Sequence, residues 1–466
     1  MLEDALREVC REAFNNTAPI EALERLSSGA SMETWALRYG SRSLILRRAP
    51  GGNEAPGDET EGTWPRVSLA TEAELLHLAR EAGVPVPPVH ATSSSASPLG
   101  PSLLMDRIPG EALPPRLFRD ARYGGALRGL LEQGASALAR IHAVAPAALP
   151  KLGPPRTPAE AVARLDRLER RFTSRSPVFS LALAWLEAHL PGEVAPKLVH
   201  GDFRMGNLLV DESGLAAVLD WELAHLGDPV EDLAWFCAPS WRFGHYAHEA
   251  GGLGSRAEWL DAYRDATAQT VDPARFDFWL VASALTWGLM CLIMADAWRR
   301  GVDRTLERAV VGTRVSESEL DLLLLLEGVA GSPKARIAWP EVSPPDHSGE
   351  TAEAELAGAL GDWVEASVQP GATGRARFEA RVARNALGIL ERRRSLGPGF
   401  AIRSARREAG LGMTGEELRA GLRDARVTLA SPGVQEHLRL LTLEKLYQDQ
   451  PRYPGLAAAE ALWRGP

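Results

Sequence analysis

The chain has 466 residues, 45% hydrophobic and 24% charged, so it is long enough for two or three folded domains, each with its own core. Its net charge of −9 at pH 7 argues against a protein that mainly coats nucleic acid or an anionic membrane. Cys10, Cys237 and Cys291 lie far apart and in no zinc-ligand spacing, which argues against a disulfide framework or a zinc site. We therefore expect a cytoplasmic protein with no nucleic-acid or membrane partner.

Residues 1–110 are predicted to contain N-terminal helices and a small mixed lobe. One or two helices are expected over residues 1–27. The alternating apolar residues Trp35, Leu37 and Tyr39, the turn "GSRS" and the apolar run "LILR" predict a β-hairpin. A helical pattern follows over 67–83, and "SLLMD" is a further strand. Strands with one helix predict an α+β lobe.

Residues 111–329 are predicted to form a mainly helical lobe, interrupted by strands around 198–220. The run "FWLVASALTWGLMCLIMA" (278–295) has no charge for eighteen residues, which just meets the length of a membrane span. Polar residues interrupt it and its tryptophans are scattered, so we predict a buried core helix. The proline-rich stretch 330–350 is predicted to be a linker, and 351–466 an all-helical accessory domain.

The stretch "LVHGDFRMGNLLVD" (198–211) places a histidine, an aspartate and an asparagine between two apolar strands, and "AVLDWE" (217–222) ends another strand in an acid. Buried charges are costly unless they meet a cation or a substrate. If "DESG" turns a hairpin, Asp220 returns to lie near Asn207, and their oxygens are ligands that suit Mg²⁺. Asp202 then remains free to accept a proton. This division of roles suits phosphoryl transfer to a hydroxyl group.

The longer string "HGDFRMGNLLVD…VLDWELAHLGDPVEDLAWF" resembles the aminoglycoside-phosphotransferase and choline-kinase branch of the protein-kinase-like fold. It is still more similar to the phosphotransferase portions fused to acyl-CoA dehydrogenases. The resemblance covers roughly residues 20–329 and implies a bilobal α+β fold that binds ATP and Mg²⁺. The stretch "RARFEARVARNALGILERR" (375–393) resembles a helical domain of unknown function that often follows these phosphotransferases.

Carried over residue by residue, the resemblance makes Asp202 the catalytic base and Asn207 and Asp220 the metal ligands. It makes His200 a residue that shapes the catalytic loop, and it places Arg204 beside substrate or phosphate.

Four further residues of the large lobe receive expected roles. Asp228 and Asp232 match structural acids that cap the following helix and hold the loop. Glu222 is expected either at the substrate or as a surface or helix-orienting acid. Arg242 is expected either at the acceptor or stacked on Trp241.

In the small lobe the resemblance implies a nucleotide site. "SSGAS" (27–31) matches the nucleotide-covering hairpin, with the site residues Ser28, Gly29, Ala30 and Ser31. Arg47 (or Arg48) would hold phosphates and pair with Glu72 (or Glu74). The hinge "LLMDRI" would meet adenine through Met105, Asp106 and Ile108. The sequence departs from the wider kinase pattern in lacking G-x-G-x-x-G and in having arginine where the strand lysine is usual; arginine still binds phosphate.

These features predict an ATP- and Mg²⁺-dependent kinase that phosphorylates a hydroxyl of a small molecule. The fused relatives suggest a hydroxyacyl-CoA or a related hydroxy acid, and an aminoglycoside remains an alternative acceptor. Another alternative is a nucleotide-binding scaffold without phosphotransfer, and a homodimer is also allowed. In the helical domain an arginine-rich helix either faces solvent or recognises a phosphorylated or CoA-like ligand; its arginines are Arg375, Arg377, Arg381, Arg384, Arg392, Arg393 and Arg394.

Overall fold

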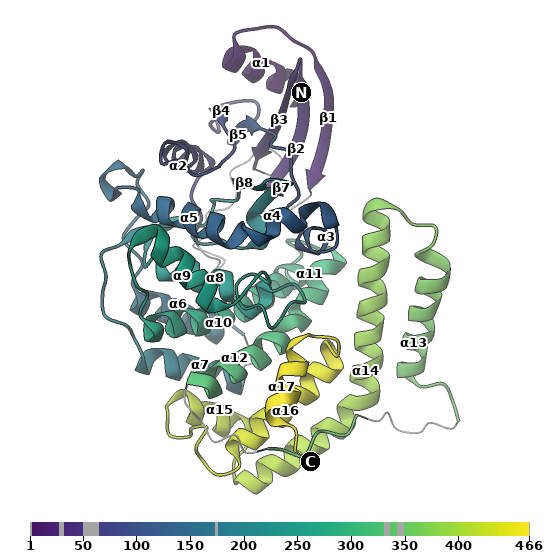
Figure 1. Ribbon diagram of the computed structural model, residues 1–466. Coiled ribbons are helices and arrows are strands. Elements are labelled where there is room, and N and C mark those ends of the chain that lie inside the picture. The colour runs from purple at the N-terminus through teal and green to yellow at the C-terminus, as the bar shows by residue number, and fades with distance from the viewer. Residues whose placement is uncertain are drawn as a thin grey trace. The chain divides into compact units, whose positions relative to one another are not determined.

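The computed structural model describes residues 2–27, 32–49, 65–172, 176–329, 336–342 and 349–465 (Figure 1). Its internal contacts divide the chain into two compact units. The first comprises Met1–Pro158 and Pro191–Leu280, and the second comprises Ala159–Leu190 and Val281–Pro466. These units group segments by contact rather than by order along the chain. The four sequence ranges predicted above, two lobes, a linker and an accessory domain, therefore remain a prediction.

The first unit begins with a five-stranded antiparallel sheet in the order β1-β2-β3-β5-β4. Its strands are β1 (Ile20–Ser27), β2 (Glu33–Tyr39), β3 (Arg42–Arg48), β4 (Val89–Ser93) and β5 (Ser102–Asp106). The hairpin predicted from alternating apolar residues is β2 and β3, and it is confirmed. The prediction of helix throughout residues 1–27 is wrong beyond α1 (Leu2–Phe14).

β1 explains this error. Its apolar residues are spaced in a way that also fits one face of a helix. In the fold, however, β1 pairs with β2, so that Leu23 lies opposite Leu37 and Arg25 opposite Trp35. The sheet edge supplies hydrogen-bond partners for the backbone of this segment, and this pairing outweighs a weak local preference.

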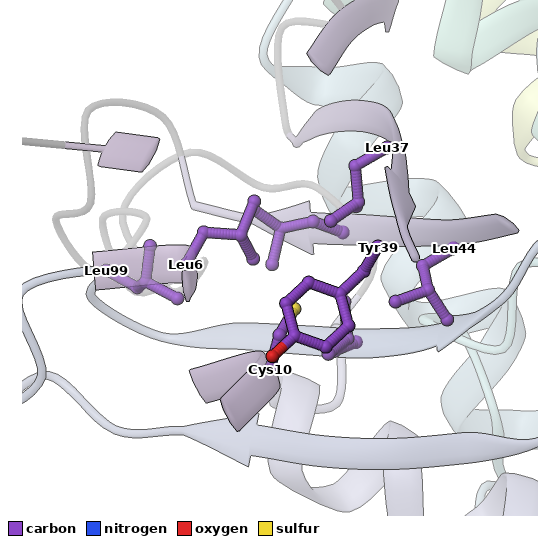
Figure 2. Packing of buried hydrophobic residues seen from close by; sticks show 8 residues of the cluster. Leu6, Cys10, Leu37, Tyr39, Leu44 and Leu99 are labelled. Atoms are coloured by element: carbon purple, nitrogen blue, oxygen red, sulfur yellow. The ribbon is translucent and has the colours of Figure 1, made fainter. Parts of the chain in front are cut away.

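α1 is fixed to the sheet by a buried cluster, shown in Figure 2. Its members are Leu6, Cys10, Leu37, Tyr39, Leu44, Leu46, Leu99 and Leu104. The Tyr39 hydroxyl donates to the carbonyl of Asn16 at 2.7 Å and accepts from the N–H of Ala18 at 3.1 Å, so its polar end is satisfied at the edge of this cluster. Each fully buried leucine contributes about 1.5–3 kcal/mol.

α2 (Leu69–Glu81) packs against β4 and β5 and carries one buried acid toward the sheet. It begins at Ser68, whose side chain accepts a hydrogen bond from the N–H of Thr71 at 3.1 Å. Glu72 lies in the first turn and is buried, whereas Glu74 is exposed. The start of α2 therefore determines which of the two acids faces the sheet.

The rest of the first unit surrounds two small two-stranded sheets. β6 (Lys197–Val199) pairs with β9 (His225–Gly227), and β7 (Leu208–Asp211) pairs with β8 (Gly214–Val218), which confirms the predicted hairpin around "DESG". Residue Glu111 bridges to Val210, which joins the segment after β5 to β7. The helices here are α3 (Pro114–Leu117), α4 (Gly124–Arg128), α5 (Leu130–Ala143), α8 (Val230–Cys237) and α9 (Arg256–Thr267).

The second unit is helical. Its elements are α6 (Pro158–Arg170), α7 (Pro177–Ala188), most of α10 (Pro273–Arg299), α11 (Leu306–Val311), α12 (Val315–Val329), α13 (Glu353–Trp363), the π-helical turn η7 (Val364–Val368), α14 (Gly374–Leu411), α15 (Gly415–Arg423), α16 (Val434–Asp449) and α17 (Gly455–Trp463). α15 packs against α7, and α16 packs against α12 and α14. Within the predicted linker, Ile337 is buried and its N–H bonds to the carbonyl of Trp463 at 2.7 Å.

α10 is the apolar helix anticipated from residues 278–295. Among the described residues it is the one helix whose length and mean hydropathy of 1.9 would allow it to cross a membrane. Within the fold, 78% of its most apolar window is buried, and a core helix meets the same criteria.

Candidate active site

The loop between β6 and β7 is held by one buried carboxylate from α8. Asp232 accepts hydrogen bonds from the backbone N–H groups of His200 (2.7 Å) and Gly201 (2.9 Å), and its Oδ2 lies 3.1 Å from Nε2 of His142. Burial alone would raise the pKa of Asp232, but the hydrogen bond and charge of His142 and these loop donors keep that pKa below its ordinary value. Asp232 thus has the structural role expected from the sequence.

Gly201 is the residue that lets this loop turn. Its φ is +81°, and a Cβ added there would lie 2.5 Å from the carbonyl oxygen of Leu223. The neighbouring His200 ring accepts from the N–H of Asp202 at Nδ1 (3.2 Å) and donates from Nε2 to the carbonyl of Leu219 (3.1 Å). One acceptor and one donor describe a neutral imidazole, and burial lowers the pKa of His200 accordingly. These two hydrogen bonds join the backbone of Asp202 to that of Leu219 through the ring of His200.

Asp202 is oriented by three donors. Its Oδ1 accepts from Nε of Arg204 (2.9 Å) and from the indole N–H of Trp235 (2.8 Å), while Oδ2 accepts from the amide of Asn207 (2.6 Å). Each carboxylate oxygen has two lone pairs, so Oδ1 is filled and Oδ2 keeps one position. The carboxylate can therefore accept one more hydrogen bond, at Oδ2.

Trp235 is a site residue that the sequence reasoning missed. It follows Asp232 by three positions on α8, so both side chains lie on one helix face. One of them holds the backbone of the loop and the other bonds to Asp202. The spacing of the acid and the tryptophan in "EDLAWF" was the available signal.

Arg204, rather than Arg242, stacks on Trp241, so the expected stacking of Arg242 on that ring is wrong. The guanidinium carbon of Arg204 lies 4.5 Å from the centre of the Trp241 ring. Arg242 is buried and donates to the carbonyls of Cys237 (Nη2, 3.0 Å) and Tyr246 (Nη1, 3.0 Å), with its guanidinium over the Tyr246 ring. The structure therefore does not bring Arg242 to Asp202, because the turn after α8 uses its donors.

A cavity of about 400 Å³ lies between the five-stranded sheet and the β7–β8 hairpin, both within the first unit. Apolar walls come from residues such as Ile45, Leu76 and Leu209. The predicted nucleotide and metal residues that line it are Arg47, Glu72, Met105, Asp106, Ile108, Asn207 and Asp220. Its volume is within the range of small-molecule sites, about 300–1,000 Å³. Ser28, Gly29, Ala30 and Ser31 lie outside the described residues.

Charged side chains converge at the inner end of this cavity. Arg47 forms an ion pair with buried Glu72, and its Nη2 lies 3.0 Å from Asp220 and 3.7 Å from Glu222. Burial raises the pKa of Glu72 although Arg47 opposes that rise. Arg48 instead pairs with Glu33 at 2.7 Å, so the register of β3 selects Arg47 for the cavity.

Glu222 lies in this charge network. It is close to Arg47 and, at 3.7 Å, to Arg66, and its carbonyl accepts from the N–H of Val67 at 2.9 Å. Burial, together with the charge of Asp220, raises the pKa of Glu222 to about 7. Glu222 thus joins the β8 side of the site to the segment before α2, and one of its two ion-pair partners, Arg47, lines the cavity.

The hinge after β5 offers one backbone donor. The N–H of Asp106 bonds to the carbonyl of Pro88 and that of Arg107 to the carbonyl of Ser43, each at 2.9 Å. Of these three successive N–H groups, only that of Ile108 has no hydrogen bond within the described chain. Among the backbone N–H groups of residues 106–108, which were expected to meet a base, that of Ile108 is therefore the one available as a donor.

A family model covers the segments that form this site. It is described as "Phosphotransferase enzyme family" (APH) and matches residues 22–279, more than half of the chain. The chain belongs to this phosphotransferase family. A second model, a domain of unknown function (DUF6285), matches residues 370–453.

Relatives of the phosphotransferase domain are parts of longer proteins. The chain is 31% identical over 248 residues to acyl-CoA dehydrogenase family member 10 of Mus musculus, covering 50% of the chain and 22% of the relative. It is 29% identical over 225 residues to family member 11 of Gallus gallus, covering 46% and 27%. The chain thus matches only about a quarter of the length of these relatives.

A solved structure supports the fold. A Ralstonia eutropha protein provisionally named an aminoglycoside phosphotransferase superposes with a TM-score of 0.55 and 22% identity, covering 70% of this chain and 98% of that one. The predicted protein-kinase-like α+β fold with a helical C-terminal region is confirmed. Membership of the family also makes small-molecule phosphotransfer the general activity of this domain.

The residues of the phosphotransferase site fit a magnesium–nucleotide. Asn207 uses its amide nitrogen on Asp202, which leaves its carbonyl oxygen without a partner among the described residues. Oδ1 of Asp220 accepts from Arg47, while no described donor reaches Oδ2. Asp220 has φ +66°, a strained conformation that aspartate tolerates and that is typical of functional sites. No group of three or more His, Cys, Asp or Glu in the described chain is placed to hold a metal, and Mg²⁺ commonly uses one or two protein oxygens plus phosphates.

Proposed function

We propose that this chain is an ATP- and Mg²⁺-dependent kinase that phosphorylates a hydroxyl group of a small molecule, with a hydroxyacyl-CoA or a related hydroxy acid as acceptor. The observation that carries the proposal is the hydrogen bond from the side-chain amide of Asn207 to Asp202. Asn207 lines the cavity together with Asp220, so this bond places the proposed proton acceptor next to the proposed metal ligands. Family membership supports the reaction class.

The nucleotide would lie in the cavity between the sheet and the β7–β8 hairpin. The apolar walls suit a base, and the N–H of Ile108 is available to it. Arg47 would bind phosphate oxygens, and Glu72 keeps its guanidinium in place. Asn207 and Asp220 would hold Mg²⁺, which, when bound, neutralises the charge of the phosphates.

Asp202 would orient the acceptor hydroxyl and take its proton at Oδ2. As the acceptor oxygen forms its bond to the γ-phosphorus, the bond between that phosphorus and the β–γ bridging oxygen breaks, and ADP leaves with the bridging oxygen. Arg204 and Trp235 hold Oδ1 throughout, so the base stays aligned. Most of the rate enhancement in such transfers comes from positioning and charge stabilisation.

The side chains beside Asp202 and the relatives of this chain both help to select the class of acceptor. Arg204 places a cation directly beside Asp202, against the Trp241 ring. Asp202 balances the charge of Arg204 through its Nε, but the remaining guanidinium N–H groups can still donate to an anionic group of an acceptor, which a polycationic aminoglycoside lacks. Similarity to segments of acyl-CoA dehydrogenase family members 10 and 11 supports an acyl-CoA-type acceptor.

The test is a panel of hydroxy compounds that includes hydroxyacyl-CoAs, free hydroxy acids and aminoglycosides. Each is incubated with the chain and Mg·ATP, and both ADP and the phosphorylated product are measured. Asp202→Asn is the matched control, because it keeps the shape of the side chain and removes its charge. We expect product with a hydroxyacyl compound and a loss of kcat of about 10²–10⁴-fold in Asp202→Asn with little change in nucleotide affinity.

Two results would contradict the proposal. Product with aminoglycosides alone would reject the acceptor class. Binding of Mg·ATP without product from any acceptor, at equal thermal stabilisation of wild type and Asp202→Asn, would favour the nucleotide-binding scaffold instead.

A further inference from the structure

A second polar pocket lies in the helical C-terminal region, wholly within the second unit. It has a volume of about 360 Å³ and is formed by α14, the turn η7 and the segment after α16. Four arginines line it and define the arginine pocket: Arg381, Arg384, Arg392 and Arg452. Two acids, Glu365 and Glu391, also line it, so the lining carries a net positive charge in a chain whose total is −9.

The spacing along α14 brings these guanidinium groups together. Arg381, Arg384 and Arg392 follow at i, i+3 and i+11 and share one face of the helix. Gly388 lies between them on this face. A Cβ added there would meet Nη1 of Arg392 at 3.0 Å and Nη1 of Arg384 at 3.5 Å. The two cationic groups therefore converge over the space that the absent side chain leaves.

The positive charge of the pocket is not fully compensated by the protein. Arg384 pairs with Asp362 (3.3 Å) and Glu365 (3.2 Å). Arg381 and Arg452, in contrast, have no hydrogen bond or ion pair with any described residue. Two cations are thus available to a ligand at one pocket.

Arg392 is partly paired with the protein and is repelled by the neighbouring arginines. Its Nε and Nη2 donate to the carbonyls of Gln448 (3.0 Å) and Asp449 (3.4 Å) at the end of α16, while Nη1 has no partner in the described chain. Burial, with added repulsion from Arg452 and Arg384, lowers the pKa of Arg392 despite the attraction of Glu391 and Asp449. An anion placed among these groups would relieve that repulsion.

The wall opposite α14 has an unusual backbone. After α13 the helix continues as the π-helical turn η7, which supplies Glu365, and Gln369 follows it into the pocket lining. Short π-helical turns are rare and occur frequently at functional sites.

We propose that the arginine pocket is a binding site for a phosphate- or pyrophosphate-bearing small molecule, separate from the kinase site. The tetrahedral phosphate group presents three or more oxygens and can bind several guanidinium forks at once. A carboxylate presents two oxygens in one plane, so it meets guanidinium groups from several directions less well than a tetrahedral phosphate does. This site uses residues of the second unit alone, so it does not depend on the proposed kinase activity.

The test is titration calorimetry with inorganic phosphate, inorganic pyrophosphate and succinate, using the full chain without nucleotide. The variant is Arg381→Gln/Arg452→Gln, which removes two cations that make no hydrogen bond or ion pair with the described residues. The matched control is Arg377→Gln/Arg406→Gln, which removes two exposed arginines of α14 that do not line the pocket. We expect pyrophosphate to bind wild type and control equally, and the pocket variant at least about tenfold more weakly.

The probes also distinguish the possible outcomes. Binding of pyrophosphate but not phosphate assigns the pocket to a diphosphate-bearing ligand, and comparable binding of both assigns it to a single phosphate. Equal affinity in pocket variant and control would place the anion elsewhere, for instance in the kinase cavity, and would overturn the proposal. Succinate binding as tightly as pyrophosphate, or no anion binding by wild type up to millimolar concentration, would also overturn it. Melting curves of all three proteins establish that they are folded.

Discussion

Replacement of Trp235 by phenylalanine is the most direct test of how the carboxylate of Asp202, the proposed base, is aligned. The substitution keeps an aromatic ring on α8, where Trp235 lies 5.3 Å from Trp241 between ring centres, but it removes the N–H that bonds to Oδ1 of Asp202 at 2.8 Å. A hydrogen bond to a charged group contributes about 1.5–3 kcal/mol. If the full amount orients the base in the transition state, kcat falls roughly 10- to 150-fold. Because Trp235 does not line the cavity, KM for ATP is expected to stay near the wild-type value.

The assay is ADP release with the acceptor found in the panel, and its control is Trp259→Phe. Trp259 is also buried, stacks on Phe236 with ring centres 4.4 Å apart, and donates its N–H to the carbonyl of Leu233 at 3.2 Å. Both variants therefore lose one indole N–H hydrogen bond and similar packing, but only one loses a bond to Asp202. Equal kcat losses in the two variants, or no loss in Trp235→Phe, would refute the assigned role.

Two predictions concern stability. Because the pKa of Asp232 is lower in the folded than in the unfolded chain, its stabilising contribution is fully present above the unfolded value near pH 4 and is lost as pH falls through the folded value. Urea unfolding should therefore show a gap between wild type and Asp232→Asn that is constant from about pH 5 to 7 and shrinks below about pH 4; an equal gap at pH 3 would contradict this. In the second unit, Arg439→Met should cost about 3 kcal/mol in the free energy of unfolding, since it leaves the partly buried Glu327 without its bidentate partner and with only the indole N–H of Trp463 among its described side-chain donors. Adding Glu327→Gln should recover part of that loss, and a loss below about 1 kcal/mol would show that α16 does not depend on the pair.

The sequence was sufficient to predict which polar side chains of the large lobe follow its short strands. Short apolar strands around "HGD" and "LDWE", with a turn between them, placed Asp220 near Asn207, and the hydrogen bond from the N–H of Leu219 to the carbonyl of Asn207 agrees with that placement. Strand pairing across a tight turn is local, so spacing alone is enough to predict it. Pairing of Arg47 with Glu72 was anticipated with an alternative for each partner, and the register of β3 and the start of α2 selected between them.

Other features depended on contacts between distant segments. β1 has a pattern that fits a helix as well as a strand, and only the edge of β2 makes it a strand. Arg242 was expected either at the acceptor or stacked on Trp241, but the turn that follows α8 uses its donors on backbone carbonyls and places its guanidinium over Tyr246. Trp235 follows Asp232 by three positions on α8, but that spacing does not say what the indole contacts; its hydrogen bond to Asp202 forms because α8 packs beside that loop.

The amino-acid sequence alone determined which residue types are available for phosphoryl transfer and in what order they follow the strands, because hydrophobic periodicity and turn chemistry act over a few residues. The tertiary structure decided which groups meet: three donors on Asp202, one free N–H at the hinge among the described residues, and four arginines around one pocket beside α14. These contacts join residues from separate elements, and the energy of burying and pairing their charges depends on the packed neighbours rather than on the chain nearby.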